Sequence, residues 1–254
     1  MRRWLGTWLL MACVLLPLPA RALGDAAWGY SYDFTNTSIQ SDLVWRATRQ
    51  ATAYDPYATG KSGGGKRQAE ESKRSVLDLG TYPERENVTG HRRLWEPEPL
   101  ERLARQLYPQ AQYAARRGMF IDLVLAFNDN VQQKYGVPKN NLATATALAL
   151  VSSHAVYSGK PVPDAFIKPL VEQLQRTMEG DPKLKDMKIG EKNDVYLSLV
   201  GVGMWFYGMQ ADVQQNPDAA REARLRETAG SYFQRLAGAA PERVSFGRKG
   251  LVVR

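Results

Sequence analysis

Two aspartates in the middle of the chain, Asp122 and Asp129, have the residue type and spacing that acid–base chemistry needs. On a helix, seven residues place them on one face about 10 Å apart along the axis. That is too far to share a proton, but near enough to flank a sugar as the carboxylates of a glycoside hydrolase do. The alternative, which we favour, is that they form the polar side of an amphipathic helix together with Gln133. We therefore predict no catalytic residue and keep these two aspartates as the candidates.

Histidine is the other residue type considered for chemistry, and the chain has two histidines, His91 and His154. Neither has a partner at the spacing of a zinc motif, so we predict no metal site and no cofactor. Ser152 and Ser153 are two residues and one residue before His154, so on a helix their side chains point in other directions than the His154 ring. We interpret His154 as a partly buried residue, with ligand or partner binding as the alternative.

Three aromatic residues with polar tips, Tyr196, Trp205 and Tyr207, lie in the longest apolar run of the mature chain. Such side chains line pockets and interfaces, and the glycines beside them leave space. Aromatic residues at helical spacing also fill protein cores, and core packing is our default interpretation. The predicted ligand-binding or partner-binding residues are Tyr196, Trp205, Tyr207 and His154.

The element that must position these aromatics is the run 193–215, which is apolar on every side when placed on a helix. Such a helix is expected to be surrounded by other helices. A membrane span is the alternative, but the apolar stretch of about 17 residues is at the lower limit for crossing a bilayer. Gly201, Gly203 and Gly208 together cost about 3 kcal/mol relative to alanine, which indicates close approach of a neighbouring backbone or ligand.

Periodic apolar residues and capping residues predict further helices around this run. We expect them at 97–108, 110–117, 119–135, 142–158, 163–178 and 219–236, with one turn at 182–187. Small residues in 142–158 predict close packing against the central helix. The predicted fold class is mainly α, a compact multi-helix bundle around the central apolar helix 193–215, with short β segments in the N-terminal extension and C-terminal tail.

Less regular regions flank the helical domain, which is expected at 94–238. Residues 25–58 form an aromatic N-terminal extension, in which alternation predicts a strand at 28–34 whose aromatics dock on the helical domain. Residues 59–93 have the composition of a flexible polar linker. Its Gly60-to-Lys66 spacing lacks the strand, helix and hydroxyl of a phosphate-binding loop. Residues 239–254 are predicted as a tail or a small hairpin of 243–246 and 251–253.

Residues 1–24 have the features of a secretory signal peptide, with two arginines, an apolar stretch and small residues before the expected cleavage near Gly24. Cleavage after Ala22 is the alternative. The expected location is the periplasm or the medium. The single cysteine, Cys13, lies in this segment, so the mature chain has no thiol chemistry. Lipidation at Cys13 is a second alternative.

Removing this segment takes away three arginines and no acids, so the net charge falls from +8 to 34 − 3 − 26 = +5. The basic residues are interleaved with acids, whereas a nucleic-acid surface needs a concentrated basic stripe. We therefore expect no nucleic-acid partner.

Three stretches together resemble a family of exported bacterial proteins of unknown function. They are the Asn-Asn and Ala-rich helix of 139–159, the apolar helix 193–212 and residues 225–236, and the likeness covers roughly residues 94–237. The resemblance implies export and a helical domain, and it implies no catalytic residue.

The leading functional hypothesis is an exported, non-enzymatic interaction or ligand-binding protein, whose partner is a protein or small molecule of the cell envelope. One alternative is an envelope glycan hydrolase using Asp122 and Asp129. Another is a membrane-associated component that uses the apolar helix at 195–211. The sequence leaves the oligomeric state open.

Overall fold

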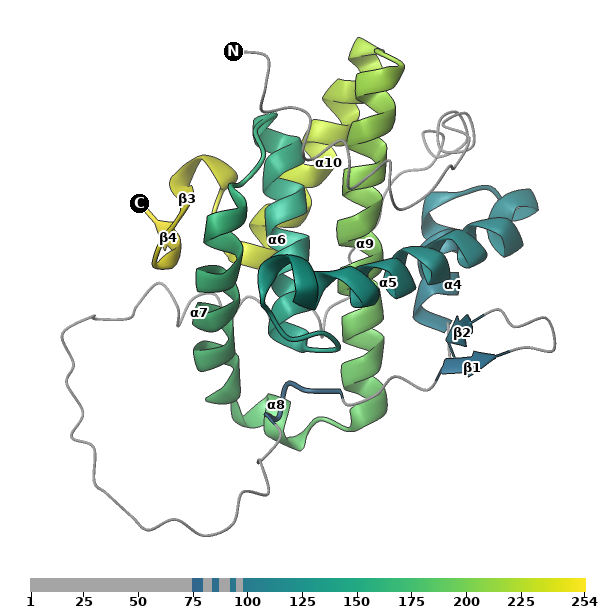
Figure 1. The fold of residues 1–254 in the computed structure, drawn as a ribbon. Coiled ribbons are helices and arrows are strands. Elements are labelled where there is room, and N and C mark those ends of the chain that lie inside the picture. Colours follow the sequence, from purple (N-terminus) through teal and green to yellow (C-terminus); the bar gives the residue numbers. More distant parts are fainter. Residues whose placement is uncertain (1–74, 80–83, 87–91, 95–97) are drawn as a thin grey trace, which may run out of the picture.

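The computed structural model describes residues 75–79, 84–86, 92–94 and 98–254 (Figure 1). The helices in these ranges are α4 (Glu98–Leu107), α5 (Tyr113–Tyr135), α6 (Leu142–Ser158), α7 (Ile167–Glu179), α8 (Pro182–Asp186), α9 (Ile189–Gln215) and α10 (Ala219–Ala237). Short 3-10 turns lie at Gln110–Gln112, Asp164–Phe166 and Pro241–Arg243. Two antiparallel hairpins complete the described chain, β1 (Glu84–Glu86) with β2 (Arg92–Leu94), and β3 (Val244–Gly247) with β4 (Gly250–Val253).

Helix α9 is the centre of this arrangement, which confirms the mainly α fold class. It packs against α4, α5, α6 and α10, and Figure 1 shows it running through the length of the bundle. Residues on different sides of the helix, including Val200, Trp205 and Phe206, are at most 1% exposed. The all-round apolar pattern therefore corresponds to a helix that is covered on all sides. None of the described helices is both long and apolar enough to cross a membrane.

The predicted close packing of 142–158 on the central helix is confirmed, since α6 makes the largest contact that α9 has. A Cβ atom added to Gly203 would lie 2.8 Å from Leu148 Cγ and 3.3 Å from the backbone nitrogen of Ala149. On the other side of α9, a Cβ on Gly201 would lie 2.9 Å from Leu103. Neighbouring helices approach the α9 backbone closely at these two glycines, which explains their presence inside a helix.

Several helix limits differ from the predicted ones for local reasons. Helix α9 begins at Ile189, one turn before the apolar run, because the Glu191 side chain accepts a hydrogen bond from the Lys188 N–H at 3.1 Å. Helix α5 continues through Gly118, where we expected a break. Pro169 lies in the first turn of α7, where the absence of an N–H group costs no helical hydrogen bond, so it does not interrupt that helix.

The corner between α9 and α10 is held by polar side chains. Asp218 caps α10 by accepting hydrogen bonds from the N–H groups of Ala220 and Arg221 at 2.9 and 3.0 Å. The Arg221 guanidinium reaches back to the carboxylate of Asp212 near the end of α9, and both residues are buried. This ion pair fixes the direction in which α10 leaves the central helix.

Part of the predicted linker is ordered structure, and this corrects the sequence-based interpretation of 59–93. Leu77 and Leu79 are 0% and 7% exposed and belong to the core of the helical domain. The β1–β2 hairpin also begins inside the predicted linker. The composition of this polar stretch did not predict the burial of Leu77 and Leu79, because two apolar residues are a weak signal for a buried segment. The predicted signal peptide, the strand at 28–34 and His91 lie outside the described residues.

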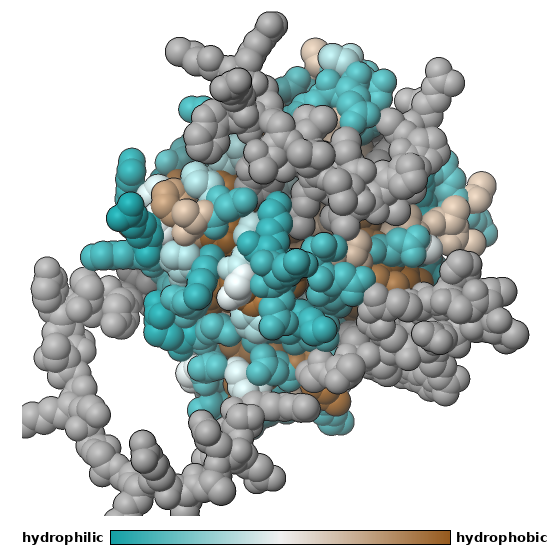
Figure 2. Space-filling view, in the orientation of Figure 1, coloured by the Kyte–Doolittle hydropathy of each residue, from teal (hydrophilic) through white to brown (hydrophobic). Residues whose placement is uncertain are grey.

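At the C-terminus, the predicted hairpin is confirmed. Strands β3 and β4 pair in the expected place, with Phe246 opposite Leu251 and Gly247 opposite Gly250. The face of the molecule seen in Figure 2 is mostly hydrophilic where described residues are exposed. The large apolar residues that are exposed in the described part are Ile189 and Val252, at 56% and 47%.

Gly203→Ala and Gly118→Ala form a matched pair, because each replaces a helix-interior glycine by the best helix former. No side chain or distant backbone lies within 4 Å of a Cβ placed at Gly118. We expect Gly118→Ala to raise the free energy of unfolding by up to about 1 kcal/mol, and Gly203→Ala to lower it by about 1–3 kcal/mol through overpacking. Urea unfolding measures both, and equal effects would show that α6 does not approach α9 closely at Gly203.

Candidate functional site

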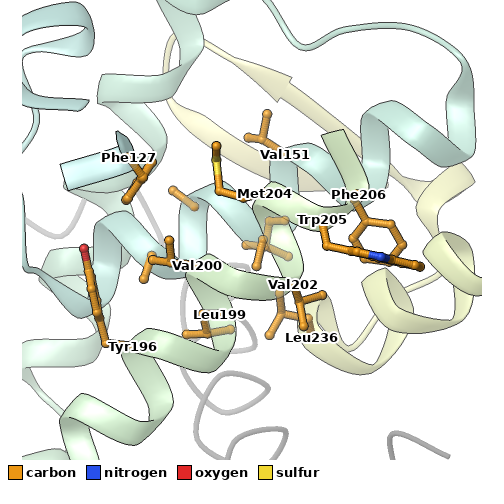
Figure 3. Packing of buried hydrophobic residues seen from close by; sticks show 14 of the residues in the cluster. Phe127, Val151, Tyr196, Leu199, Val200, Val202, Met204, Trp205, Phe206 and Leu236 are labelled. Atoms are coloured by element: carbon orange, nitrogen blue, oxygen red, sulfur yellow. The ribbon is translucent and has the colours of Figure 1, made fainter. Parts of the chain in front are cut away.

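Two of the predicted binding residues are core residues. Tyr196 and Trp205 are 0% and 1% exposed, and Figure 3 shows them extending from separate turns of α9 within the buried cluster. The Tyr196 hydroxyl donates to Asn128 Oδ1 on α5. The Trp205 indole donates from Nε1 to the Tyr108 hydroxyl at 3.1 Å. Their polar tips are thus engaged inside the domain, and their rings present no surface to a ligand in this structure.

Tyr207 lies on a different side of α9 and is partly buried. Its neighbours include Tyr135 at the end of α5 and Asp164 before α7. Burial raises the pKa of the Tyr207 hydroxyl, and the negative charge of Asp164 adds to the rise. Burial is also the main cause that raises the pKa of Tyr135, and the charge of Asp164 adds to it. Both phenols are therefore protonated at neutral pH, and they act as hydrogen-bonding groups rather than as bases.

The candidate acids Asp122 and Asp129 are both exposed on α5, as is Gln133. Their environment is that of the solvated face of an amphipathic helix, as the favoured interpretation predicts. Among the described residues, no group of three or more His, Cys, Asp or Glu side chains is placed to hold a metal ion.

His154 lies under the C-terminal hairpin, where three structural elements meet. Its ring makes edge contacts with Phe233 of α10 and Phe246 of β3, at centroid distances of 5.4 and 5.0 Å. The backbone of Pro241, just before β3, also influences the ring, since it favours the protonated imidazole. His154 therefore holds the hairpin against α6 and α10.

The four predicted binding residues consequently have different neighbours. Tyr196 faces α5, Trp205 meets Tyr108, Tyr207 lies near Tyr135, and His154 touches the hairpin. The structure does not bring them together in one site. Spacing on a helix could not reveal this, because it gives the direction of each side chain but not the element that covers it.

One short segment, Ser75–Leu79, makes specific contacts with several helices, and we call it the anchor segment. It runs beside α8 as the short blue stretch in Figure 1. Asp78 forms an antiparallel bridge with Asn141, the Leu79 N–H donates to the Asn140 carbonyl at 2.9 Å, and the Leu142 N–H donates to the Leu77 carbonyl at 3.1 Å. The segment is therefore held to the start of α6 as one strand is held to another.

Side chains add further bonds to the anchor segment. Asn141 caps α6 through Oδ1, which accepts from the Ala143 N–H at 2.9 Å, while its Nδ2 donates to Asp78 at 2.6 Å. Lys192 of α9 is 8% exposed, and its ammonium donates to the Val76 carbonyl at 2.8 Å. The hydroxyl of Ser75 donates to Glu179 at the end of α7. Three helices thus bind five residues of the predicted linker.

Sequence reasoning missed this site, although a signal was present. Leu77 and Leu79 alternate with Asp78, the pattern of a short strand with one buried face. Three residues are too few to stand out from a charged surrounding, and the groove that receives them is assembled from distant parts of the chain.

The described residues form a mainly helical domain, built around one buried helix and closed by a C-terminal hairpin. The chain belongs to a family of unknown function, DUF6683, whose model matches residues 7–254. The family predicted from residues 94–237 is therefore confirmed as one of unknown function, and the match extends over almost the whole chain. Comparisons with curated proteins and with solved structures gave no significant match.

Leu77→Ala tests whether the anchor segment is a part of the folded core. Truncating this fully buried side chain leaves a cavity, and we expect the free energy of unfolding to fall by about 2–5 kcal/mol. Val76→Ala is the matched control, because Val76 is partly exposed in the same segment, and its loss is expected to be roughly 1 kcal/mol or less. Equal small losses in urea unfolding would mean that the segment is not docked in solution.

His154 predicts a pH dependence of stability with a definite sign. Burial lowers the pKa of the imidazole, and the Pro241 backbone and the Glu242 charge oppose this only in part. The unfolded chain therefore takes up a proton near pH 6.5, before the folded chain does. The contribution of the neutral His154 ring to the free energy of unfolding is fully present above that pH. It is lost as the pH falls through the pKa that the ring has in the folded chain.

The measurement is the difference in unfolding free energy between wild type and His154→Gln, from pH 8 to pH 5. Because glutamine does not titrate and His91 is common to both proteins, the difference isolates His154. We expect the advantage of the wild type to shrink below about pH 6.5. A difference that stayed constant over this range would contradict a neutral, half-buried imidazole.

Proposed function

We propose that this protein is an exported, non-enzymatic interaction protein, in which the helical domain is a rigid base that holds an N-terminal arm of residues 25–74. The observation that carries the proposal is the anchor segment. Residues 75–79 are tied by backbone and side-chain hydrogen bonds to α6, α7 and α9. The point at which the arm is attached to the domain is therefore fixed at Ser75.

The composition of the arm supports a role in binding. Its aromatic part, 28–34, has side chains with large contact area and polar tips, which are enriched at protein interfaces. Its Gly- and Lys-rich part, 59–74, separates these aromatics from the anchor segment. Tyr196 and Trp205 of the domain are engaged internally with Asn128 and Tyr108, so we expect the arm to supply aromatic groups to a partner.

The signal-peptide features of residues 1–24 support export. Cleavage near Gly24 places Asp25 at the new N-terminus, which puts the aromatic part of the arm at the free end of the chain. In this arrangement, the arm carries the contact residues and the folded domain fixes where they start. The partner would be a protein or small molecule of the cell envelope.

The test is site-specific photo-crosslinking in cells that export the full chain. A photoreactive residue replaces Tyr30 in the arm, or Asp129 on the exposed face of α5 as the control. We expect the chain recovered outside the cytoplasm to have the intact mass of a form beginning at Asp25, with discrete adducts to another molecule from position 30 that position 129 does not give. An uncut chain, or the same adducts from both positions, would overturn the proposal.

A further inference from the structure

Among the described residues, one edge of the C-terminal hairpin is bonded to a side chain and the other edge pairs with no strand. Arg254 N–H donates to the Arg243 carbonyl at 2.7 Å, so 243 and 254 form a hydrogen-bonded pair. Antiparallel pairs alternate, which makes Ser245 with Val252 the next hydrogen-bonded pair. The backbone groups of Phe246 and of its partner Leu251 therefore point away from each other, toward the two outer edges.

At the β4 edge, these groups are already satisfied. The Leu251 N–H donates to Gln173 Oε1 at 2.7 Å, and Gln173 Nε2 donates to the Leu251 carbonyl at 3.0 Å. The amide of this α7 side chain thus takes the place of a neighbouring strand. On the other side of β3, away from β4, no strand of the described residues pairs with Phe246, because the sheet in this part of the chain consists of β3 and β4. An open edge of this kind accepts an added strand.

The two faces of the hairpin differ in chemistry. On the inner face, Phe246 and Leu251 pack toward the domain, and Phe246 continues an aromatic cluster with His154 and Phe233. On the outer face, Val252 is 47% exposed and lies between the exposed Arg243–Arg254 pair at one end and the turn at the other. The turn carries two more exposed cations, Arg248 and Lys249. An added strand would have to be apolar on one face and acidic on the other.

We infer that the open β3 edge binds the arm strand, residues 28–34 of this same chain, as a third strand. Its even-numbered residues are all aromatic: Trp28, Tyr30, Tyr32 and Phe34. Its odd-numbered residues are Gly29, Ser31 and Asp33. In an extended strand, these two sets face opposite sides. The aromatic set extends the cluster of Phe246 and His154, and Asp33 comes to the arginine-bearing face.

Charge and chain length both favour this occupant. From Asp25 to Trp45 the chain contains three aspartates and no basic residue, whereas the hairpin contributes four cations. The 40 residues from 35 to 74 connect the arm strand to the anchor segment. A flexible chain of that length has a root-mean-square span of roughly 35 Å, and it can extend to about 130 Å. The tether therefore reaches any face of a domain this size and holds the strand at a high effective concentration.

This inference deepens the proposed function, since it gives the arm a resting position, and its test needs no outside partner. The full mature chain beginning at Asp25 has no cysteine, so two introduced thiols report on one contact. Ser31→Cys with Ser245→Cys places both thiols on the arginine-bearing face. Ser31→Cys with Gln132→Cys, an exposed position on α5, is the control. We expect an intramolecular disulfide to form at least tenfold faster in the first pair, at a rate independent of protein concentration.

A charge variant separates docking at this edge from random encounters along the tether. Asp33→Lys should slow disulfide formation in the 31–245 pair several-fold, whereas Asp42→Lys, outside the arm strand, should leave it unchanged. Equal rates for the two cysteine pairs, or equal effects of the two charge changes, would overturn the inference. A disulfide between two chains that increases with protein concentration would also overturn it, by identifying a second copy as the occupant. Each of these results leaves the photo-crosslinking test of the proposed function unaffected.

Discussion

A helix that is apolar on every side is stable in water only when other elements cover all of it, and α9 imposes this constraint on the rest of the domain. Helices α4, α5, α6 and α10 supply the cover. Two of them come so near that the α9 backbone must have glycine at the contacts, Gly201 against Leu103 and Gly203 against Leu148. The loss of helix propensity at these positions is offset by close packing.

Covering α9 also brings polar groups inside, and the structure gives them partners. The Tyr196 hydroxyl bonds to Asn128, and the Trp205 indole bonds to Tyr108. Arg221 and Asp212 form a buried ion pair where α9 turns into α10. Leaving such groups unpaired would cost each about 1–3 kcal/mol. The aromatics that looked most suited to a ligand thus serve to align the helices.

Surfaces available for recognition therefore lie at the edges of the bundle. At one edge, the anchor segment is added to the start of α6, where Asn141 both caps the helix and bonds Asp78. At another, the C-terminal hairpin has a β3 edge that pairs with no strand of the described residues, and exposed arginines lie on its outer face. The anchor segment is held by backbone hydrogen bonds, which is also how peptides are recognised at sheet edges.

The class of fold, the central helix and the C-terminal hairpin could be predicted from periodicity, capping residues and turn residues, which act over a few neighbouring positions. The family of unknown function was predicted from a resemblance over residues 94–237, and the family model confirms it. Core packing was our default interpretation of Tyr196 and Trp205, and their burial confirms it. That His154 holds a hairpin and that Leu77 is fully buried could be seen only in the folded domain. Burial of a side chain depends on elements distant in sequence, and a local pattern carries no record of which distant element covers it.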